Sequence, residues 1–238
     1  MNSFRIFIGW DSREDIAYQV AKQSLLRHAS IPADVEPIKL NELVENGLFT
    51  RDVDPLASTE FTYSRFLTPY LANYEGWALF CDCDFLFFGD VAKLKEYMNP
   101  DHAVACVHHD YTPKETTKMD GAVQTVYPRK NWSSFMLFNC AHPSTRQLTP
   151  EVVNRESGAY LHRMQWAKDE EIGEIPNSWN WLEGWNEIPN DGALPNAVHF
   201  TRGGPWFEDW QNVDFAKEWI AEADAYKATQ SGDQSQLL

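Results

Sequence analysis

Apolar runs of strand length alternate along this chain with amphipathic segments of helix length, and this order constrains the fold more than any other feature. The runs 4–9 and 35–40 flank a segment, 15–28, whose apolar residues recur at helical spacing. The further expected elements keep the same order, with helices at 64–74 and 91–98 and strands at 77–80, 103–107 and 133–139. Such alternation, with strands apolar on both sides, predicts an α/β fold with a mainly parallel central sheet flanked by helices.

The last third of the chain differs in composition from the rest. Eight of the ten tryptophans lie after residue 130, and residues 179–210 are rich in Trp, Asn, Gly and Pro with little periodicity. No Gly/Ser-rich or Pro-rich linker marks a domain boundary. We therefore expect a single domain over residues 1–229 whose C-terminal third is rich in loops and packs on the sheet, followed by a disordered tail at 230–238.

The charge balance and the cysteines limit the classes of partner. The chain has 20 Lys and Arg against 35 Asp and Glu, a formal net charge of −15, and an acidic surface repels nucleic acid. No apolar run approaches the ~20 residues of a membrane helix, and the N-terminus lacks the pattern of a signal peptide. The four cysteines have no disulfide or metal spacing, so we expect buried free thiols and a cytoplasmic location. The oligomeric state is not indicated.

Two carboxylates stand inside an apolar stretch. Asp82 and Asp84 are embedded in residues 79–88, where every other residue is apolar or cysteine. A buried charge is costly unless it is paired or bound to a cation. A turn directly after the strand places both carboxylates at its carboxyl end, where open α/β sheets bind ligands, and oxygen ligands suit Mg²⁺ or Mn²⁺. The alternative interpretation is a strand-ending turn with solvated carboxylates.

The second signal lies late in the chain, in residues 197–207. His199 ends a strand-like run there and precedes Gly203-Gly204, with Arg202 beside the glycines. Imidazole is a suitable third ligand for Mn²⁺ next to two carboxylates, and glycines let backbone N–H groups approach an anion closely. We therefore expect His199 to be a metal ligand, whereas the other histidines are expected to be structural, with His109 placed where it could touch a ligand.

Together these two motifs resemble the GT-A-type glycosyltransferases, and most closely glycosyltransferase family 8, the group of glycogenin and the bacterial galactosyltransferases. That family has an Asp-x-Asp after an apolar strand and a late His-x-x-Gly-x-x-Lys-Pro-Trp segment, matched here by Asp82, Asp84, His199 and Pro205-Trp206. The resemblance implies Mn²⁺ (or Mg²⁺) on Asp82, Asp84 and His199, a UDP-sugar as donor, and a carbohydrate or other hydroxyl acceptor. It also implies transfer with retention of configuration.

Looser matches extend the resemblance over roughly residues 4–207. Asp169-Glu170-Glu171 resembles the family's Asp-Gln-Asp segment, which implies that Asp169 and Glu170 lie near the anomeric carbon and stabilise an oxocarbenium-like transition state or orient the acceptor. The segment 177–181 resembles its downstream Trp-Asn, and 133–139 resembles the strand that carries Asn-Ala-Gly. Arg65 matches a family arginine near the diphosphate and the sugar.

The sequence departs from the family at the phosphate-binding lysine, where Gly204 stands. We expect Arg202, or the backbone of Gly203-Gly204, to replace that lysine. The turn after the first strand resembles the nucleotide-base site. The expected contacts to the nucleotide sugar are therefore Gly9, Trp10, Asp11, Arg13, Arg65, Asp82, Cys83, Arg202, Gly203 and Gly204. Residues 110–130 carry Lys114, Lys118, Arg129 and Lys130 and are interpreted either as a lid over the diphosphate or as a solvated surface loop.

Two other functions fit parts of the pattern. Phosphohydrolases of the haloacid dehalogenase type also use Asp-x-Asp after an apolar strand, but they place it on the first strand and follow it with Thr or Val, whereas Phe85 follows here. A non-catalytic protein that binds a nucleotide or a sugar on the same fold is the other alternative, and the missing lysine is its best argument.

Overall fold

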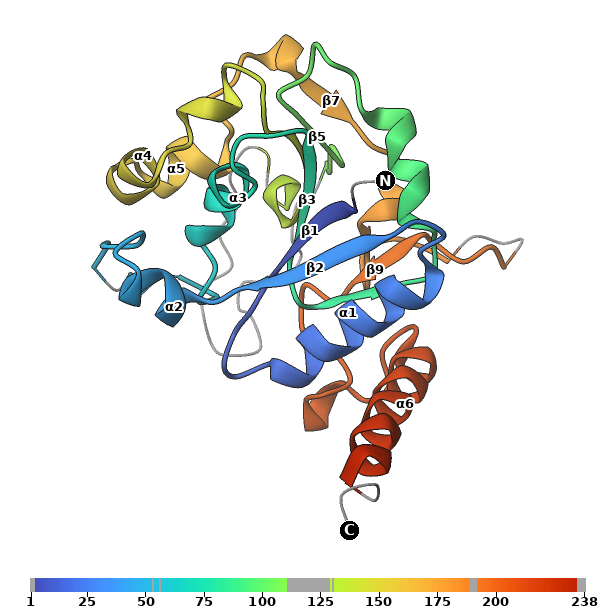
Figure 1. Ribbon diagram of the computed structural model, residues 1–238. Coiled ribbons are helices and arrows are strands. Elements are labelled where there is room, and N and C mark those ends of the chain that lie inside the picture. The colour runs from blue at the N-terminus through green and yellow to red at the C-terminus, as the bar shows by residue number, and fades with distance from the viewer. Residues whose placement is uncertain are drawn as a thin grey trace.

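The computed structural model describes residues 3–52, 54–55, 57–110, 129, 131–188 and 192–234 (Figure 1). A sheet of six strands has the spatial order β2-β1-β3-β6-β5-β7, and a sheet of three strands has the order β4-β9-β8. In chain order, the strands are β1 (Phe4–Gly9), β2 (Ala33–Ile38), β3 (Trp77–Cys81), β4 (Phe85–Phe87), β5 (Val104–Cys106), β6 (Phe135–Asn139), β7 (Ile172–Glu174), β8 (Trp181–Leu182) and β9 (Ala197–His199).

The larger sheet is mainly parallel, which confirms the fold class expected from the sequence. β1 pairs in parallel with β2 and β3, β5 pairs in parallel with β7, and β6 is antiparallel to both β3 and β5. Among these six strands, β6 alone therefore runs in the opposite direction. The central strands are fully buried, with Leu79, Phe80 and Leu137 at 0% exposure. This burial on both faces explains why their sequences read as uninterrupted apolar runs.

Helices flank the larger sheet on both sides, with α1 on the right and α4 and α5 on the left in Figure 1. The α-helices are α1 (Asp15–His28), α2 (Leu40–Glu45), α3 (Thr68–Leu71), α4 (Pro150–Arg155), α5 (Gly158–His162) and α6 (Ala216–Gln234). The 3₁₀ helices are η1 (Ser64–Leu67), η2 (Val91–Tyr97), η3 (Trp132–Ser134), η4 (Thr145–Gln147), η5 (Asp169–Glu171), η6 (Asn177–Trp179) and η7 (Glu208–Trp210).

The strand 4–9 and the helix 15–28 have the bounds expected from the sequence. The helix expected at 64–74 is instead η1 followed by the single turn of α3, and it ends before Asn73 and Tyr74 because both take left-handed φ angles, 56° and 55°. The strand expected from residue 133 begins at Phe135, since the preceding residues form η3.

The C-terminal end of the described chain is helical where disorder was expected. The helix α6 runs as far as Gln234, five residues past the expected end of the domain at 229. Once a helix is nucleated, each added residue fixes only its own backbone and gains one hydrogen bond, so polar residues can continue it. Residues 235–238 lie outside the described part of the chain.

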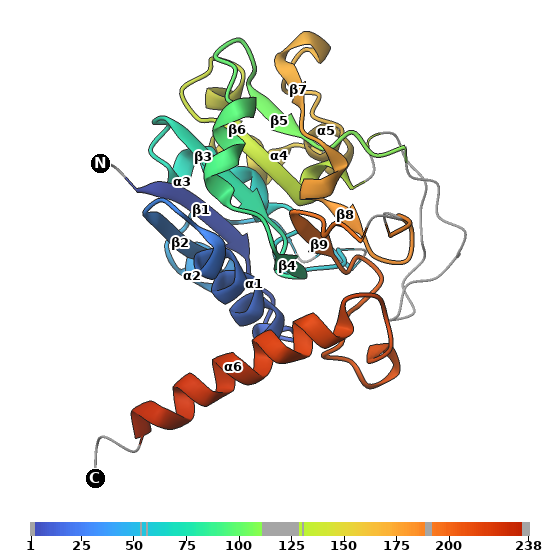
Figure 2. The same ribbon diagram turned by 90° about the vertical axis from the view of Figure 1, so that its right-hand side faces the viewer.

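A second apolar cluster joins the smaller sheet to α1 and α6. Val20 of α1, Val198 of β9 and Trp219 of α6 meet in it, at 0%, 0% and 4% exposure. Figure 2 shows α6 lying beside α1 and then extending beyond the rest of the molecule. Gln23 donates a hydrogen bond of 2.8 Å to Glu222 across this contact, and Arg27 pairs with the same carboxylate at 3.1 Å.

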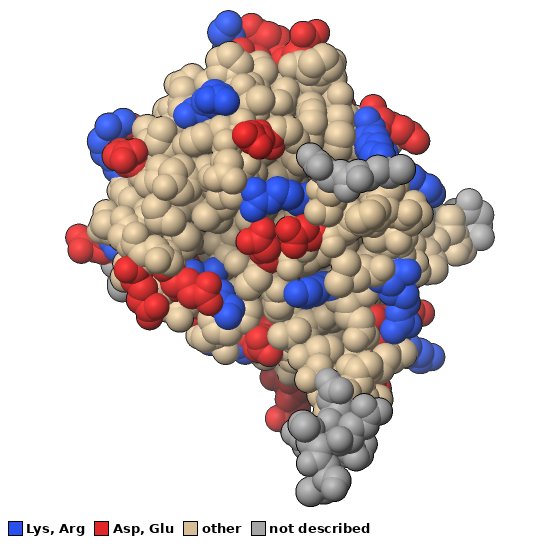
Figure 3. Space-filling view, in the orientation of Figure 1, with Lys and Arg blue, Asp and Glu red and all other residues tan. Residues whose placement is uncertain are grey.

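Several expectations from composition can be compared with the structure. The four cysteines are free and buried, as expected. None of the described helices combines the length and the hydropathy that a membrane span requires. On the face shown in Figure 3, basic and acidic side chains of the described residues are interspersed rather than separated into regions of one sign.

Candidate metal and nucleotide site

The candidate site is built where the chain passes from the larger sheet to the smaller one. β3 ends at Cys81 and β4 begins at Phe85, so Asp82 and Asp84 occupy the short connection between the two sheets. The backbone N–H of Asp82 donates to the carbonyl of Ser134, 3.0 Å away, which keeps the first carboxylate at the carboxyl end of β3. This is the edge of the sheet where parallel α/β proteins bind ligands.

The smaller sheet brings His199 to the same place. In the antiparallel pairing of β4 with β9, His199 stands opposite Phe85, and their rings stack with centroids 4.4 Å apart. The backbone N–H of Phe200 donates to the carbonyl of Asp84 at 2.9 Å. As a result, His199 Nε2 lies 3.2 Å from Asp84 Oδ1, although 115 residues separate the two in sequence.

Asp82, Asp84 and His199, which the sequence analysis expected to bind a metal, lie together in one cluster. One carboxylate oxygen of each aspartate and one ring nitrogen of His199 lie within 4.8 Å of one another. The side chains are only 13%, 19% and 4% exposed, respectively. Asp84 Oδ1 is buried and, apart from its 3.2 Å contact with His199 Nε2, has no hydrogen-bond partner among the described residues, so a cation could serve as its partner. Two hard oxygens and one imidazole fit Mn²⁺, and also Mg²⁺.

The charges around the cluster are partly compensated. Arg65, which is 5% exposed, places Nη1 2.7 Å from Asp82 Oδ1 and 2.9 Å from the carbonyl of Ser133. Burial raises the pKa of Asp84, but its contact with His199, a backbone hydrogen bond and the charge of Arg65 together outweigh this and hold the pKa below its ordinary value. Asp84 is therefore ionised at neutral pH, and Arg65 lies beside Asp82.

The turn after β1 lies beside these carboxylates. Asp11 is fully buried, and its carboxylate accepts hydrogen bonds from the side chain and backbone of Arg13 and from the N–H of Glu60. Gly9 passes directly beneath Phe61, since a Cβ there would lie 2.4 Å from the ring. Burial, together with the charges of Asp84 and Asp11, raises the pKa of Glu14 to about 8.

Glu14 was missed by the sequence analysis. It stands directly before α1, three residues beyond Asp11, and a carboxyl group with a raised pKa beside two other acids is typical of a ligand site. The feature of the sequence that could have identified Glu14 was its position directly after the turn expected to hold the nucleotide base.

The late glycine segment differs from the expectation. Arg202 Nη2 lies 3.1 Å from Glu183, which is 3% exposed, and its guanidinium lies over the ring of Trp210 at 5.2 Å. The N–H of Gly203 donates to the carbonyl of Phe200 at 2.8 Å. A buried carboxylate requires a positive partner, so in this structure the positive charge of Arg202 compensates the carboxylate of Glu183.

Asp169 and Glu170 were expected near the anomeric carbon of the donor and not among the metal ligands, and they are not part of the cluster of Asp82, Asp84 and His199. Both are exposed in η5, directly before β7, which runs parallel to β5. The start of a parallel strand lies at the opposite edge of the sheet from the carboxyl ends, where Asp82 is found. The carboxylate of Asp169 instead pairs with Arg129 at 2.5 Å. The local pattern Asp169-Glu170-Glu171 contains no information on the pairing of β7 with β5, and this pairing decides at which edge of the sheet the segment lies.

The segment that does reach the site is α5. His162 Nδ1 lies 2.7 Å from Ser133 Oγ, next to the carbonyl that binds Arg65. Gly158 lies at the start of α5 against Tyr63, 3.4 Å from the position a Cβ would take. The sequence analysis had treated His162 as structural and had assigned no role to this segment.

A polar network also missed by the sequence analysis surrounds His199. Asn180, which is 0% exposed, places Oδ1 2.8 Å from His199 Nδ1 and donates from Nδ2 to Ser134 Oγ at 2.9 Å. Asn180 belongs to the segment 177–181, whose resemblance to the family's Trp-Asn was the available signal.

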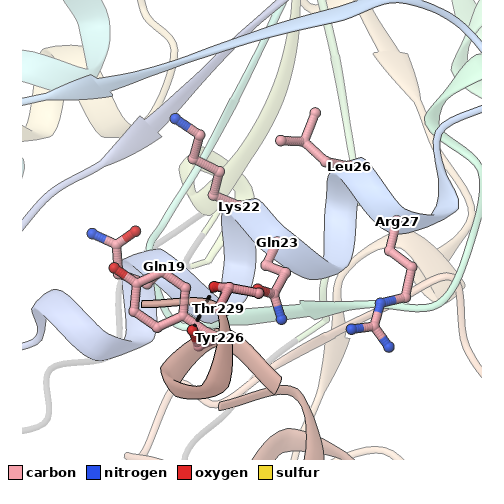
Figure 4. A pocket seen from close by; sticks show the side chains of 7 residues that line it. All are labelled: Gln19, Lys22, Gln23, Leu26, Arg27, Tyr226 and Thr229. Carbon is pink, nitrogen blue, oxygen red and sulfur yellow. Dashed lines mark hydrogen bonds between the residues drawn. The ribbon is translucent and has the colours of Figure 1, made fainter. Parts of the chain in front are cut away.

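Two other regions complete the comparison. In the expected lid, Lys114, Lys118 and Lys130 lie outside the described residues, and Arg129 stacks on Trp132 at 5.3 Å. A groove of about 540 Å³ between α1 and α6, shown in Figure 4, is lined by Gln19, Lys22, Gln23, Leu26, Arg27, Tyr226 and Thr229. It shares no residue with the cluster at the carboxyl end of β3.

Known proteins resemble this chain in sequence and in fold. No family model matches the chain. It is 55% identical over 225 residues to Protein CDI of Arabidopsis thaliana, covering 94% of this chain and 87% of that protein. The structure is similar to the apo form of the glycosyltransferase GlyE of Streptococcus pneumoniae TIGR4, with a TM-score of 0.63 and 14% identity. That match covers 98% of this chain but only 64% of the GlyE chain.

A second solved structure matches over nearly its whole length. The galactosyltransferase LgtC, in complex with donor and acceptor sugar analogs, has a TM-score of 0.59 and 11% identity, with 93% of this chain and 96% of that chain covered. At these identities the similarity concerns the fold, and it confirms the GT-A glycosyltransferase fold expected from the sequence.

Proposed function

The chain belongs to the family of Protein CDI, and from its GT-A fold and its site we propose that it is a metal-dependent glycosyltransferase. The donor is a nucleotide sugar, most simply a UDP-sugar, and the acceptor is a carbohydrate or another hydroxyl compound. The proposal includes the finer resemblance to glycosyltransferase family 8 and, with it, transfer with retention of configuration.

One observation carries this proposal, namely the convergence of Asp82, Asp84 and His199 within 4.8 Å at the carboxyl end of β3. Asp82 and Asp84 lie in the connection between the two sheets and His199 ends β9 of the smaller sheet, so only the fold brings the histidine to the two carboxylates. Carboxylates collected in this way repel one another unless a cation or a proton joins them. A divalent cation that also binds a diphosphate satisfies this requirement.

The surrounding residues supply a place for the nucleotide. The turn from Gly9 to Arg13 and the connection after β3 lie at neighbouring strand ends, because β1 and β3 pair in parallel. The base and ribose are proposed to lie in this turn, beside Trp10, Asp11 and Cys83, with the diphosphate directed toward Asp82. Glu14 is added to the proposed contacts, since its partly buried carboxyl faces the same space.

In the proposed reaction the chain mainly orients and stabilises. Asp82, Asp84 and His199 would hold the cation, which supplies electrostatic stabilisation of the departing diphosphate. Arg65 holds Asp82 in place through its 2.7 Å contact. The buried position of the cluster strengthens these interactions, because water screens them less there than at an open surface.

The proposal is tested by incubating the protein with a panel of nucleotide sugars in the presence of Mn²⁺, Mg²⁺ or EDTA and measuring the nucleoside diphosphate released. We expect slow release from UDP-sugars that requires the metal and is lost in Asp84→Asn. Release that is unaffected by EDTA would contradict metal dependence, and the absence of both binding and release for every nucleotide sugar would contradict the donor class.

A non-catalytic protein that binds a nucleotide sugar is the second candidate. Two observations favour it: Asp169 and Glu170 are exposed in η5 outside the cluster, and Arg202 is paired with Glu183. The same assay separates the two functions, because a binding protein would show metal-dependent stabilisation by UDP-sugars without release of UDP. The phosphohydrolase alternative predicts hydrolysis of a simple phosphate ester instead, and the structural similarity to glycosyltransferases gives it no support.

A further inference from the structure

We propose that Asn180 is a positioning residue that fixes the orientation and the tautomer of His199, so that the Nε2 lone pair faces the cation. The inference rests on the metal site proposed above. Asn180 is fully buried, and the proposed reaction assigns it no other role. The inference follows from the direction of the hydrogen bonds around this side chain.

The direction of each hydrogen bond can be traced from Ser134. Its hydroxyl donates to the carbonyl of Asn131 at 2.7 Å, which uses its single proton. The oxygen of Ser134 must then accept from Asn180, whose Nδ2 lies 2.9 Å away. Nδ2 also lies 3.4 Å from the carbonyl of Asn131. Two acceptors on one side therefore fix which end of the amide is the nitrogen, and Oδ1 points at His199.

The orientation of this amide decides the state of His199. The amide oxygen Asn180 Oδ1 can accept a hydrogen bond but cannot donate one, so the Nδ1 atom 2.8 Å away must carry a proton. In the neutral ring, Nε2 then carries a lone pair and is directed at Asp84 Oδ1, 3.2 Å away. Two electron-rich atoms at this distance require a cation or a shared proton between them, and the proposed metal supplies the cation. Stacking on Phe85 fixes the plane of the ring, and Asn180 fixes its rotation within that plane.

Asn180 also joins the two halves of the site. Ser134, which accepts from its amide, uses its own carbonyl to accept the N–H of Asp82 at 3.0 Å. The same buried side chain is thus hydrogen-bonded to Ser134, whose carbonyl holds the backbone of Asp82, and to the ring of His199, which ends a strand of the smaller sheet. Partners of metal-bound imidazoles are typically worth about ten- to hundredfold in metal affinity.

The test is a Mn²⁺ titration of the full chain in the presence of UDP, followed by electron paramagnetic resonance of the bound ion for coupling to imidazole nitrogen. Asn180→Leu removes the acceptor at similar volume, and we expect about ten- to hundredfold weaker Mn²⁺ binding with loss of the nitrogen coupling. Asn180→Asp keeps an acceptor for Nδ1, and we expect it to retain both.

Thr145→Val is the matched control. It removes a buried hydrogen bond of 2.9 Å, from Thr145 to the carbonyl of Ala103, outside the site. We expect it to lower the melting temperature without changing Mn²⁺ affinity or the nitrogen coupling. A folded Asn180→Leu variant with unchanged affinity and coupling would overturn the inference.

If Asn180→Leu does not fold, Ser134→Ala decides, because it removes the nearer of the two acceptors that fix the orientation of the amide. Weaker Mn²⁺ binding in Ser134→Ala than in Thr145→Val supports the inference, and equal binding overturns it. Failure of the wild-type protein to bind Mn²⁺ with UDP is a different result, since it contradicts the metal site itself.

Discussion

At the scale of single residues, the site is a set of buried charges that are held by specific partners. Arg65 compensates Asp82, and His199 faces Asp84. In both pairs each side chain is less than one-fifth exposed. Groups buried this far from water lose their hydration, so removing one partner leaves the other uncompensated. Substitution of a residue that would bind the cation is expected to change metal binding, whereas substitution of a residue that keeps the carboxylates in place is expected to change stability.

Asp84→Asn is expected to abolish the Mn²⁺-dependent binding of UDP while the protein stays folded. The amide is close to the carboxylate in size but carries no negative charge for the cation. Isothermal titration calorimetry with and without Mn²⁺ measures the effect. Asp34→Asn, at an exposed position of β2, removes the same charge elsewhere and should leave binding unchanged. Equal Mn²⁺-dependent affinity in Asp84→Asn and wild type would refute the assignment of Asp84 as a ligand.

Arg65→Met is expected to destabilise the protein by about 3–5 kcal/mol, the usual cost of leaving one partner of a buried ion pair alone. Urea unfolding measures this change. The double variant Arg65→Met/Asp82→Asn should recover part of the loss, because no unpaired charge remains. Arg155→Met breaks an exposed pair with Glu156 and serves as control, with an expected cost of about 0–1 kcal/mol. A loss no larger than that of Arg155→Met would show that the buried pair is unimportant.

His162 is expected to make stability depend on pH in the acidic range. Burial, with the charge of Arg65, lowers its pKa to about 3, whereas an unfolded chain protonates histidine near pH 6.5. Between these values the unfolded state binds the extra proton. The free energy of unfolding therefore falls as the pH falls, by at most about 1.4 kcal/mol per pH unit from this group.

The corresponding variant is His162→Phe, which keeps an aromatic ring but cannot be protonated. Unfolding free energies measured between pH 7 and pH 4 should fall less steeply in this variant than in wild type. His28→Gln, at an exposed position of α1, is the comparison. A slope identical to that of wild type would mean that His162 is accessible to protons in the folded state.

At the scale of elements, the site depends on one strand connection and on the helix that secures the smaller sheet. The chain leaves the larger sheet after β3, and three residues later it enters the smaller sheet as β4. This short connection gives Asp82 and Asp84 fixed positions relative to His199, because β4 pairs directly with β9. The smaller sheet has only three short strands, and its outer apolar cluster is completed by α6.

Trp219→Ala, in α6, is expected to cost about 3–5 kcal/mol of stability, the range for removing a large buried side chain. Trp219 is 4% exposed in the second apolar cluster, whereas its neighbour Ile220 is 39% exposed. Ile220→Ala on the same helix is therefore the control and should cost clearly less. Denaturant unfolding with tryptophan fluorescence and circular dichroism measures both. Similar losses in the two variants would show that α6 contributes little to the anchoring of the smaller sheet.

At the scale of the whole molecule, the parts that could be predicted from sequence are those set by local patterns. The spacing of apolar residues alone predicted the bounds of β1 and α1. The position of Asp82 and Asp84 inside an apolar run marked them as candidate ligands. Features that depend on pairing between distant segments were not accessible. The pairing of β7 with β5 decides where Asp169 lies relative to the sheet, and the buried Glu183 pairs with Arg202. Neither fact leaves a local trace in the sequence.

The network around His199 shows the same limit. His199 was identified from its position before two glycines, but Asn180 and Ser134 become its neighbours only when the two sheets are assembled. A pattern of residue types therefore identifies the ligands of the site, while their supporting partners follow from the complete fold.

The central claim is that Asp82, Asp84 and His199 bind one divalent cation together with a nucleoside diphosphate. Crystals of the full chain soaked with Mn²⁺ and UDP test this most directly, because anomalous diffraction locates manganese independently of any model of the site. We predict one manganese peak ligated by an oxygen of Asp82, an oxygen of Asp84, Nε2 of His199 and the diphosphate of UDP. Ordered UDP without a manganese peak among these three side chains, or with manganese bound elsewhere, would contradict the account.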